Sequence, residues 1–124
     1  DPVNDRIVYF GGSSGKKYDL NSGGAESDVT FGGAQAAKAD ANSWCWCDDT
    51  ASFLGKEWGT GTAIYECHPT TFAVTTRSIA GTAPPAPFAD GRGSLYGRFG
   101  YIKELGLVFY IPRHDTNVWA FRTR

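Results

Sequence analysis

The stretch IVYFGGSSGKKYDL, residues 7–20, places four apolar residues directly before a Gly-Gly pair and a Gly-Lys-Lys run. Two interpretations compete: a glycine-rich loop that cradles a phosphate, or a strand that ends at a turn. A phosphate-binding loop needs a Gly, four residues, then Gly-Lys-Ser/Thr and a helix. Here Phe10 stands in place of the first Gly, Lys17 stands in place of Ser or Thr, and no helical pattern follows. The stretch therefore predicts a β-strand over residues 7–10 that turns at the Gly-Gly pair.

The composition of the whole chain also favours short strands. A chain of 124 residues has room for one domain, and sixteen Gly, six Pro and 15% aromatic residues are typical of the all-β class. Twelve basic and thirteen acidic residues give a formal net charge of -1, which provides no overall attraction to nucleic acid or to an anionic membrane. We therefore expect neither nucleic acid nor a membrane as a partner.

The clearest strand signals lie in GRFGYIKELGLVFYIPRHDTNVWAFRTR, residues 97–124. Turn residues divide it into strands at 99–102, 107–111 and 118–121, which predicts an antiparallel meander. LVFYI is apolar at five successive positions, so both of its faces are expected to be covered, and IVYF at residues 7–10 gives the same expectation. Strands buried on both faces in antiparallel meanders are typical of β-propellers, whose blades each lie between two neighbours.

Two parts of the chain resemble repeats of kelch and galactose-oxidase-like β-propellers. In the first, DRIVYFGG is followed by AIYECHPTTFAVTT, with Tyr65 and then Phe72 where the family usually has Trp. The second, from about residue 97 to residue 124, resembles a closing repeat, with YGRFGYI (96–102) at its start, NVWAF as a later strand, and Ile-Pro where the family has Gly-Gly. The resemblance implies an all-β fold of antiparallel meander sheets, a partial propeller of about two kelch-like blades.

The same resemblance implies a domain organisation. Residues 13–62 form a long insertion within the first blade-like unit, in which AQAAKADA has the composition for two helical turns, and residues 80–93 form a Pro/Gly linker between the units. The chain 1–124 is then a single domain or the C-terminal part of a propeller. Because the chain starts with Asp-Pro and contains no Met, we expect the second case, with the remaining blades supplied by the same or another chain.

Three cysteines leave their chemistry open: Cys45, Cys47 and Cys67. They can remain unlinked and buried, they can form a bridge from Cys67 to Cys45 or Cys47, or they can join His68 in a Cys₃His zinc site. A bridge within the Cys-x-Cys pair itself would be strained. For an exported chain we expect the bridge to Cys67.

Loops gather at the two ends of a propeller, where ligands bind. PRHDTN is the richest loop, because Arg113, His114 and Asp115 offer a cation, an imidazole and a carboxylate, although a solvated turn would carry the same residues. Trp58 is the best candidate for an exposed platform for a sugar ring, whereas Trp119 is expected in the core. The further polar candidates in loops are Lys16, Lys17, Asp48, Asp49, His68, Arg92 and Arg98.

These residues predict a non-catalytic recognition module that binds a glycan or a protein through Trp58, Arg113, His114 and Asp115. The alternative is part of a secreted carbohydrate-active enzyme, a polysaccharide lyase or an oxidase, with catalytic residues partly outside this chain. No catalytic residue can be assigned, because the sequence lacks the Gly-x-Ser-x-Gly of a nucleophile elbow and neither of its two histidines sits in a copper motif of the oxidase family. We expect no cofactor and a secreted or cell-surface location.

Overall fold

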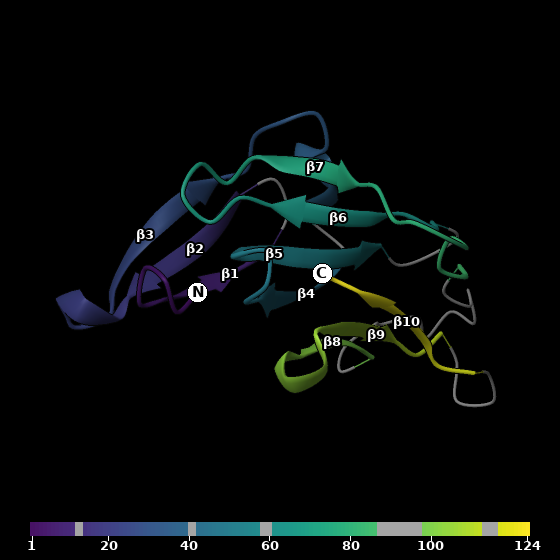
Figure 1. The fold of residues 1–124 in the computed structure, drawn as a ribbon. Helices are drawn as coiled ribbons and strands as arrows, with labels where there is room; N and C mark the ends of the chain where they lie inside the picture. The colour runs from purple at the N-terminus through teal and green to yellow at the C-terminus, as the bar shows by residue number, and fades with distance from the viewer. Residues whose placement is uncertain (12–13, 40–41, 58–60, 87–97, 113–116) are drawn as a thin grey trace.

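The computed structural model describes residues 1–124 except 12–13, 40–41, 58–60, 87–97 and 113–116. The described strands form three antiparallel sheets in which each strand pairs with the next along the chain (Figure 1). The first sheet contains β1 (Arg6–Tyr9), β2 (Ser14–Asp19) and β3 (Ala25–Thr30). The central sheet contains β4 (Asn42–Cys47), β5 (Ser52–Glu57), β6 (Ile64–Cys67) and β7 (Val74–Arg77). The third sheet contains β8 (Phe99–Ile102), β9 (Leu107–Tyr110) and β10 (Trp119–Arg122).

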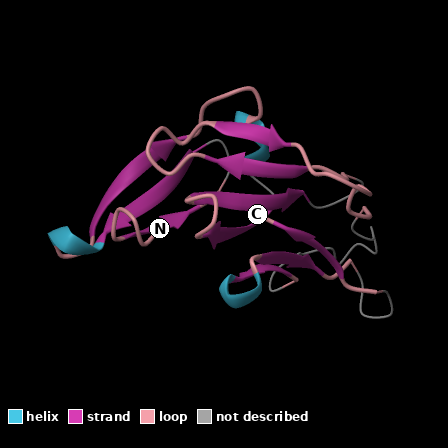
Figure 2. Cartoon of the chain, in the orientation of Figure 1, coloured by secondary structure: helices cyan, strands magenta, loops and turns pink. Residues whose placement is uncertain are grey.

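Helical structure is limited to single turns. The described part of the chain has no α-helix and three short 3₁₀ segments, η1 (Leu20–Ser22), η2 (Ala36–Ala39) and η3 (Lys103–Leu105), which Figure 2 shows in cyan. η3 ends at Gly106, whose φ of 58° lies in the left-handed region that glycine adopts without strain. The N–H of Gly106 donates to the Lys103 carbonyl and closes the turn that joins β8 to β9.

The central sheet is covered on both of its faces. Successive side chains of a strand point to opposite faces, and five consecutive residues of β5, Ser52 to Lys56, are buried. Phe53 belongs to a hydrophobic cluster with residues of the first sheet, whereas Leu54 belongs to a second cluster with residues of the third sheet. Figure 1 shows the central sheet between the other two.

The core between the first and central sheets is aromatic. The ring of Phe10 stacks on Phe31 at a centroid distance of 5.0 Å and on Trp44 at 4.5 Å, and it meets Phe53 edge-on at 5.2 Å. Such ring pairs stabilise a core beyond the burial of their apolar area. Phe72 completes the contact, with its ring edge-on to Phe31.

The core between the central and third sheets is smaller and contains a buried cation. Leu54 and Ile64 pack there with Val108 and Phe121. Lys56 is fully buried, with its Nζ 5.2 Å from the centre of the Tyr110 ring. Its Nζ donates to the carbonyl oxygens of Glu57 at 3.1 Å and Gly61 at 2.7 Å. These contacts offset the desolvation free energy that burial of the ammonium costs.

The all-β class and the antiparallel meanders are confirmed, and the three strands expected near the C-terminus are β8, β9 and β10. AQAAKADA does not form an α-helix within its described residues, where η2 is one short 3₁₀ segment.

The expected insertion at residues 13–62 and the two sequence pieces that flank it are distributed over two sheets. β1 pairs with β2 in the first sheet, while Tyr65 lies on β6 in the central sheet, so DRIVYFGG and AIYECHPTTFAVTT do not share a sheet. Residues 14–57 instead supply β2 to β5. The Pro/Gly segment 80–93 lies between β7 and β8, with residues 80–86 of it among those described.

The expectation that IVYF is buried on both faces is wrong. Ile7 and Tyr9 are 57% and 62% exposed, and only Val8 and Phe10 pack against the aromatic core. In LVFYI the positions also alternate, since Val108 and Tyr110 are fully buried whereas Leu107 and Phe109 are half-buried. These strands belong to the two outer sheets, each of which has one covered face.

The three cysteines are free, so the bridge expected from Cys67 is not formed. Cys45 and Cys47 lie on β4 and point to the third sheet, whereas Cys67 lies on β6 and points to the first sheet. Because β5 lies between β4 and β6, the Cα atom of Cys67 is two strand spacings, about 9.5 Å or more, from the Cα atoms of Cys45 and Cys47. This distance is beyond the reach of a disulfide.

Gly55 on β5 is required opposite Trp44, its partner on β4. A Cβ on Gly55 would lie 2.7 Å from the Trp44 ring, which is held by Phe10 and by a hydrogen bond from its Nε1 to the Ala39 carbonyl. We expect Gly55→Ala to lower the free energy of unfolding by roughly 1–3 kcal/mol through overpacking, measured by urea denaturation. Gly32→Ala is the matched control, because nothing lies within 4 Å of its added Cβ. Equal stability of the two variants would contradict this account of the core.

Candidate functional site

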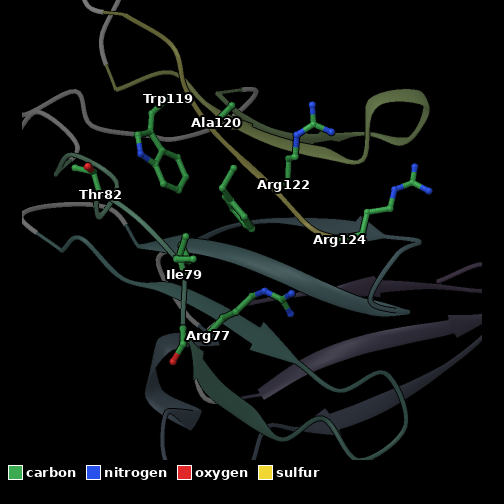
Figure 3. A pocket seen from close by; sticks show the side chains of 10 residues that line it. Arg77, Ile79, Thr82, Trp119, Ala120, Arg122 and Arg124 are labelled. Atoms are coloured by element: carbon green, nitrogen blue, oxygen red, sulfur yellow. The ribbon is translucent and has the colours of Figure 1, made fainter.

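A cavity of about 540 Å³ lies between the end of β7 and β10 (Figure 3). Its volume is within the range of small-ligand sites. The side chains that give it chemical character are Arg77, Ile79, Trp119, Phe121, Arg122 and Arg124. They come from two segments that are far apart in the sequence and meet only in the folded chain.

The cavity lies where the described strands of the third sheet, one fewer than those of the central sheet, end. β8 lies against β4, and β10 is an edge strand, so the third sheet ends before it covers β7. Arg77 on β7 pairs in register with Ile64, which packs toward the third sheet, so Arg77 points to the same side. The face of β7 that a fourth strand would cover is therefore open to the cavity.

Trp119 forms the aromatic wall of the cavity. Its ring lies 5.3 Å from that of Phe121, and it packs half-buried against the core between the central and third sheets. Figure 3 shows its side chain on the side of β10 where Ile79 and Thr82 lie. Trp119 was expected to be core, but the structure gives it an accessible face beside the cavity as well.

Three arginines line the cavity, and none of the described residues in its lining is acidic. The guanidinium of Arg77 pairs with Glu66 at 2.7 Å, and that of Arg124 pairs with Asp49 at 3.4 Å. Arg122 has no ion-pair partner among the residues that the structure describes. The rim of the cavity therefore carries an excess of positive charge, and its uncompensated part is Arg122, whose side chain points away from Arg77 and Ile79 on the outer face of β10 (Figure 3).

A second polar cluster lies at the end of β5. The Glu57 carboxylate accepts hydrogen bonds from Lys38 Nζ and, at 2.9 Å, from the Tyr65 hydroxyl. Burial raises the pKa of Glu57, but these two hydrogen bonds outweigh burial and hold the pKa below its usual value. Burial and the neighbouring carboxylate raise the pKa of Tyr65 to about 12. The cluster thus holds a carboxylate and a protonated phenol, with its charges satisfied internally.

The four residues expected to bind ligand, Trp58, Arg113, His114 and Asp115, lie outside the described residues, as does Arg92. The described candidates do not meet in one place. Lys16 pairs with Glu26 and Asp28 on the outer face of the first sheet, and Lys17 pairs with Asp19. The Nδ1 of His68 accepts the backbone N–H groups of Thr70 and Thr71 and so closes the turn between β6 and β7.

Asp48, Asp49 and Arg98 also lie outside the cavity lining. Asp48 pairs with Lys103 at 3.0 Å, and Asp49 pairs with Arg124 at the rim of the cavity. In WAFRTR, residues 119–124, the aromatic residues Trp119 and Phe121 alternate with positions 120, 122 and 124, two of which are arginines. That alternation predicts a strand edge with one aromatic face and one cationic face.

The part of the chain that is described brings no three His, Cys, Asp or Glu residues together as a metal site, so the Cys₃His arrangement is not assembled there. Burial raises the pKa values of the Cys45 and Cys67 thiols to about 12, which keeps both thiols protonated at neutral pH. Within the same residues, no helix has the length and apolar character to cross a membrane.

No family model, curated protein or solved structure matches this chain. The interpretation of the cavity therefore rests on its own geometry.

Because the ammonium of Lys56 is buried, we expect the free energy of unfolding to depend on pH. Burial lowers the pKa of Lys56 to about 8, whereas the unfolded chain has a lysine pKa of about 10.4. Between these values the unfolded state binds more protons, so the contribution of Lys56 to the free energy of unfolding rises with pH. Relative to Lys56→Met, the wild type should gain about 1–3 kcal/mol between pH 7 and pH 10.

Urea denaturation of both proteins at each pH measures this difference. The other titrating groups are common to both proteins and cancel in the comparison. A difference in stability that does not change with pH would show that Lys56 titrates normally in the folded chain.

Proposed function

We propose that this protein is a non-catalytic recognition module that binds an anionic ligand, carried on a glycan or on a protein, in the cavity between β7 and β10. The observation that supports it best is the described lining, in which one tryptophan face lies beside three arginines and no acidic side chain is present.

The chemistry of these side chains fits an anion attached to a partly apolar body. An aromatic face stacks on a sugar ring or on an apolar side chain, and the planar guanidinium of arginine binds carboxylate, sulfate or phosphate through two parallel hydrogen bonds. Arg122 is available for such a pair because no described residue neutralises it. A glycan ligand would fit a secreted or cell-surface location.

We propose further that the three sheets are kelch-like blades of a β-propeller. The support is that consecutive antiparallel meanders are stacked face to face, with a four-stranded sheet in the middle. The outer faces are partly apolar: Ile7 and Tyr9 are exposed on the first sheet, and Ile102 on the third. Further blades, from the same chain or another, would cover these faces.

Substitution of Arg122 tests the proposed anion site. We expect wild-type protein to bind an oligogalacturonate or a glutamate-rich peptide more tightly than their neutral counterparts, and we expect Arg122→Glu to lose about tenfold or more in affinity. Isothermal titration calorimetry measures both. Binding should also weaken as ionic strength rises from about 0.05 to about 0.5 M.

Lys103→Glu is the matched control, because Lys103 is an exposed cation outside the cavity lining whose surface ion pair is worth little. It should bind like wild type. Equal affinity for anionic and neutral ligands, or full binding by Arg122→Glu, would refute the proposed site.

The proposed blade packing is tested by self-association of this chain alone. Exposed apolar sheet faces associate in water, so light scattering should show a mass that rises with concentration. The double variant Ile7→Lys/Tyr9→Lys should reduce this association, because it places charge on the outer face of the first sheet. A strictly monomeric wild type would argue against unsatisfied blade faces.

A further inference from the structure

No strand of the described residues pairs with the outer edge of β10, so its outward backbone hydrogen-bonding groups have no described strand partner. β10 pairs with β9 on one side only, in a sheet whose order is β10-β9-β8. Thr123 donates its N–H to the Gly106 carbonyl, so position 123 faces β9. Because backbone groups alternate in direction along a strand, the N–H and C=O of Trp119 and Phe121 also face β9, while those of Ala120 and Arg122 face away.

This free edge runs along the cavity. Ala120 and Arg122, whose backbone groups face outward, both line the cavity, and so does Arg77 on the facing strand β7. The four-stranded central sheet has β7 at the position where the third sheet has no strand among the described residues. The cavity is therefore a slot with hydrogen-bonding groups along one wall and the open face of β7 along another.

We propose that an extended acidic peptide segment adds to β10 as the fourth strand of the third sheet. This inference rests on the proposed function and specifies its ligand. In β-strand addition the main-chain hydrogen bonds supply affinity, and alternate side chains supply specificity. Ala120 and Arg122 supply the main-chain bonds.

The side-chain pattern of the added strand follows from the two faces of β10. Ligand residues opposite Ala120 and Arg122 point to the outer face of the third sheet, where an acidic side chain meets the Arg122 guanidinium. The residues between them point to the same side as Trp119 and Phe121, where apolar side chains meet these rings and Ile79. The preferred ligand alternates acidic and apolar residues.

Charge favours this partner over a second copy of the chain. Pairing β10 with β10 of another copy would bring like charges from Arg122 and Arg124 together across the new pair of strands. An acidic partner instead neutralises the cation that the described residues leave without an ion pair.

The experiment uses a soluble peptide that alternates glutamate and valine, together with the same peptide N-methylated on alternate backbone nitrogens. We expect the first peptide to bind and to slow hydrogen exchange at the amides of Ala120 and Arg122. N-methylation on the edge that faces β10 should reduce affinity at least tenfold, because it removes donors without changing side-chain charge. A lysine–valine peptide should not bind.

Two protein variants separate the contribution of main-chain hydrogen bonds to affinity from that of side-chain charge. Ala120→Pro removes an outward N–H at an edge position where proline is tolerated, and it should weaken binding of the glutamate–valine peptide far more than binding of an oligogalacturonate, which forms no strand pairing. Arg122→Glu should weaken both ligands. Thermal melts of each variant establish that it is folded.

The outcomes distinguish this inference from the proposed function. If only the oligogalacturonate binds, in an Arg122-dependent manner, the anion site stands and strand addition is wrong. If neither ligand binds, both are wrong. Equal affinity for the N-methylated peptide, or protection of Ala120 and Arg122 that grows with protein concentration without peptide, would overturn strand addition by an acidic partner.

Discussion

The structure depends on the burial of both faces of the central sheet. A sheet with two apolar faces is stable only when other layers cover both of them. In β5, Phe53 and Gly55 face the first sheet, while the side chains of Leu54 and Lys56 face the third sheet. The same strand therefore contributes to both cores. The two outer sheets have no such constraint, and their strands carry one covered face and one exposed face.

The candidate site follows from this stacking. A three-stranded sheet cannot cover a four-stranded one completely, and since β8 lies against β4, the uncovered part falls at β7. The polar residues of β7 reflect this position: Arg77 is neutralised by Glu66, and Glu66 also accepts a hydrogen bond from Ser52, which lies on the same face. Paired polar groups let this face of the sheet stay stable beside an open cavity.

The strands of the third sheet could be predicted from the sequence, whereas β2 to β5 could not. The strands of the third sheet are separated by clear turn residues, and their apolar runs match β8, β9 and β10 closely. β4 and β5 were missed because WCWC and SFLGKE lie where the repeat resemblance required an insertion, and because the Gly and Lys of β5 interrupt its apolar run. Only the register shows that Gly55 makes room for Trp44 and that Lys56 reaches Tyr110.

The cavity was beyond sequence reasoning for a related reason. It lies where no described strand of the third sheet covers β7, and such an uncovered position has no signal of its own in the sequence. Net charge was equally uninformative, because a total of -1 averages over ion pairs that cancel locally. Around the cavity Glu66 and Asp49 neutralise Arg77 and Arg124, which leaves Arg122 at the edge strand. A single charge at that edge has two effects, since it opposes pairing with a like-charged edge and attracts an acidic one.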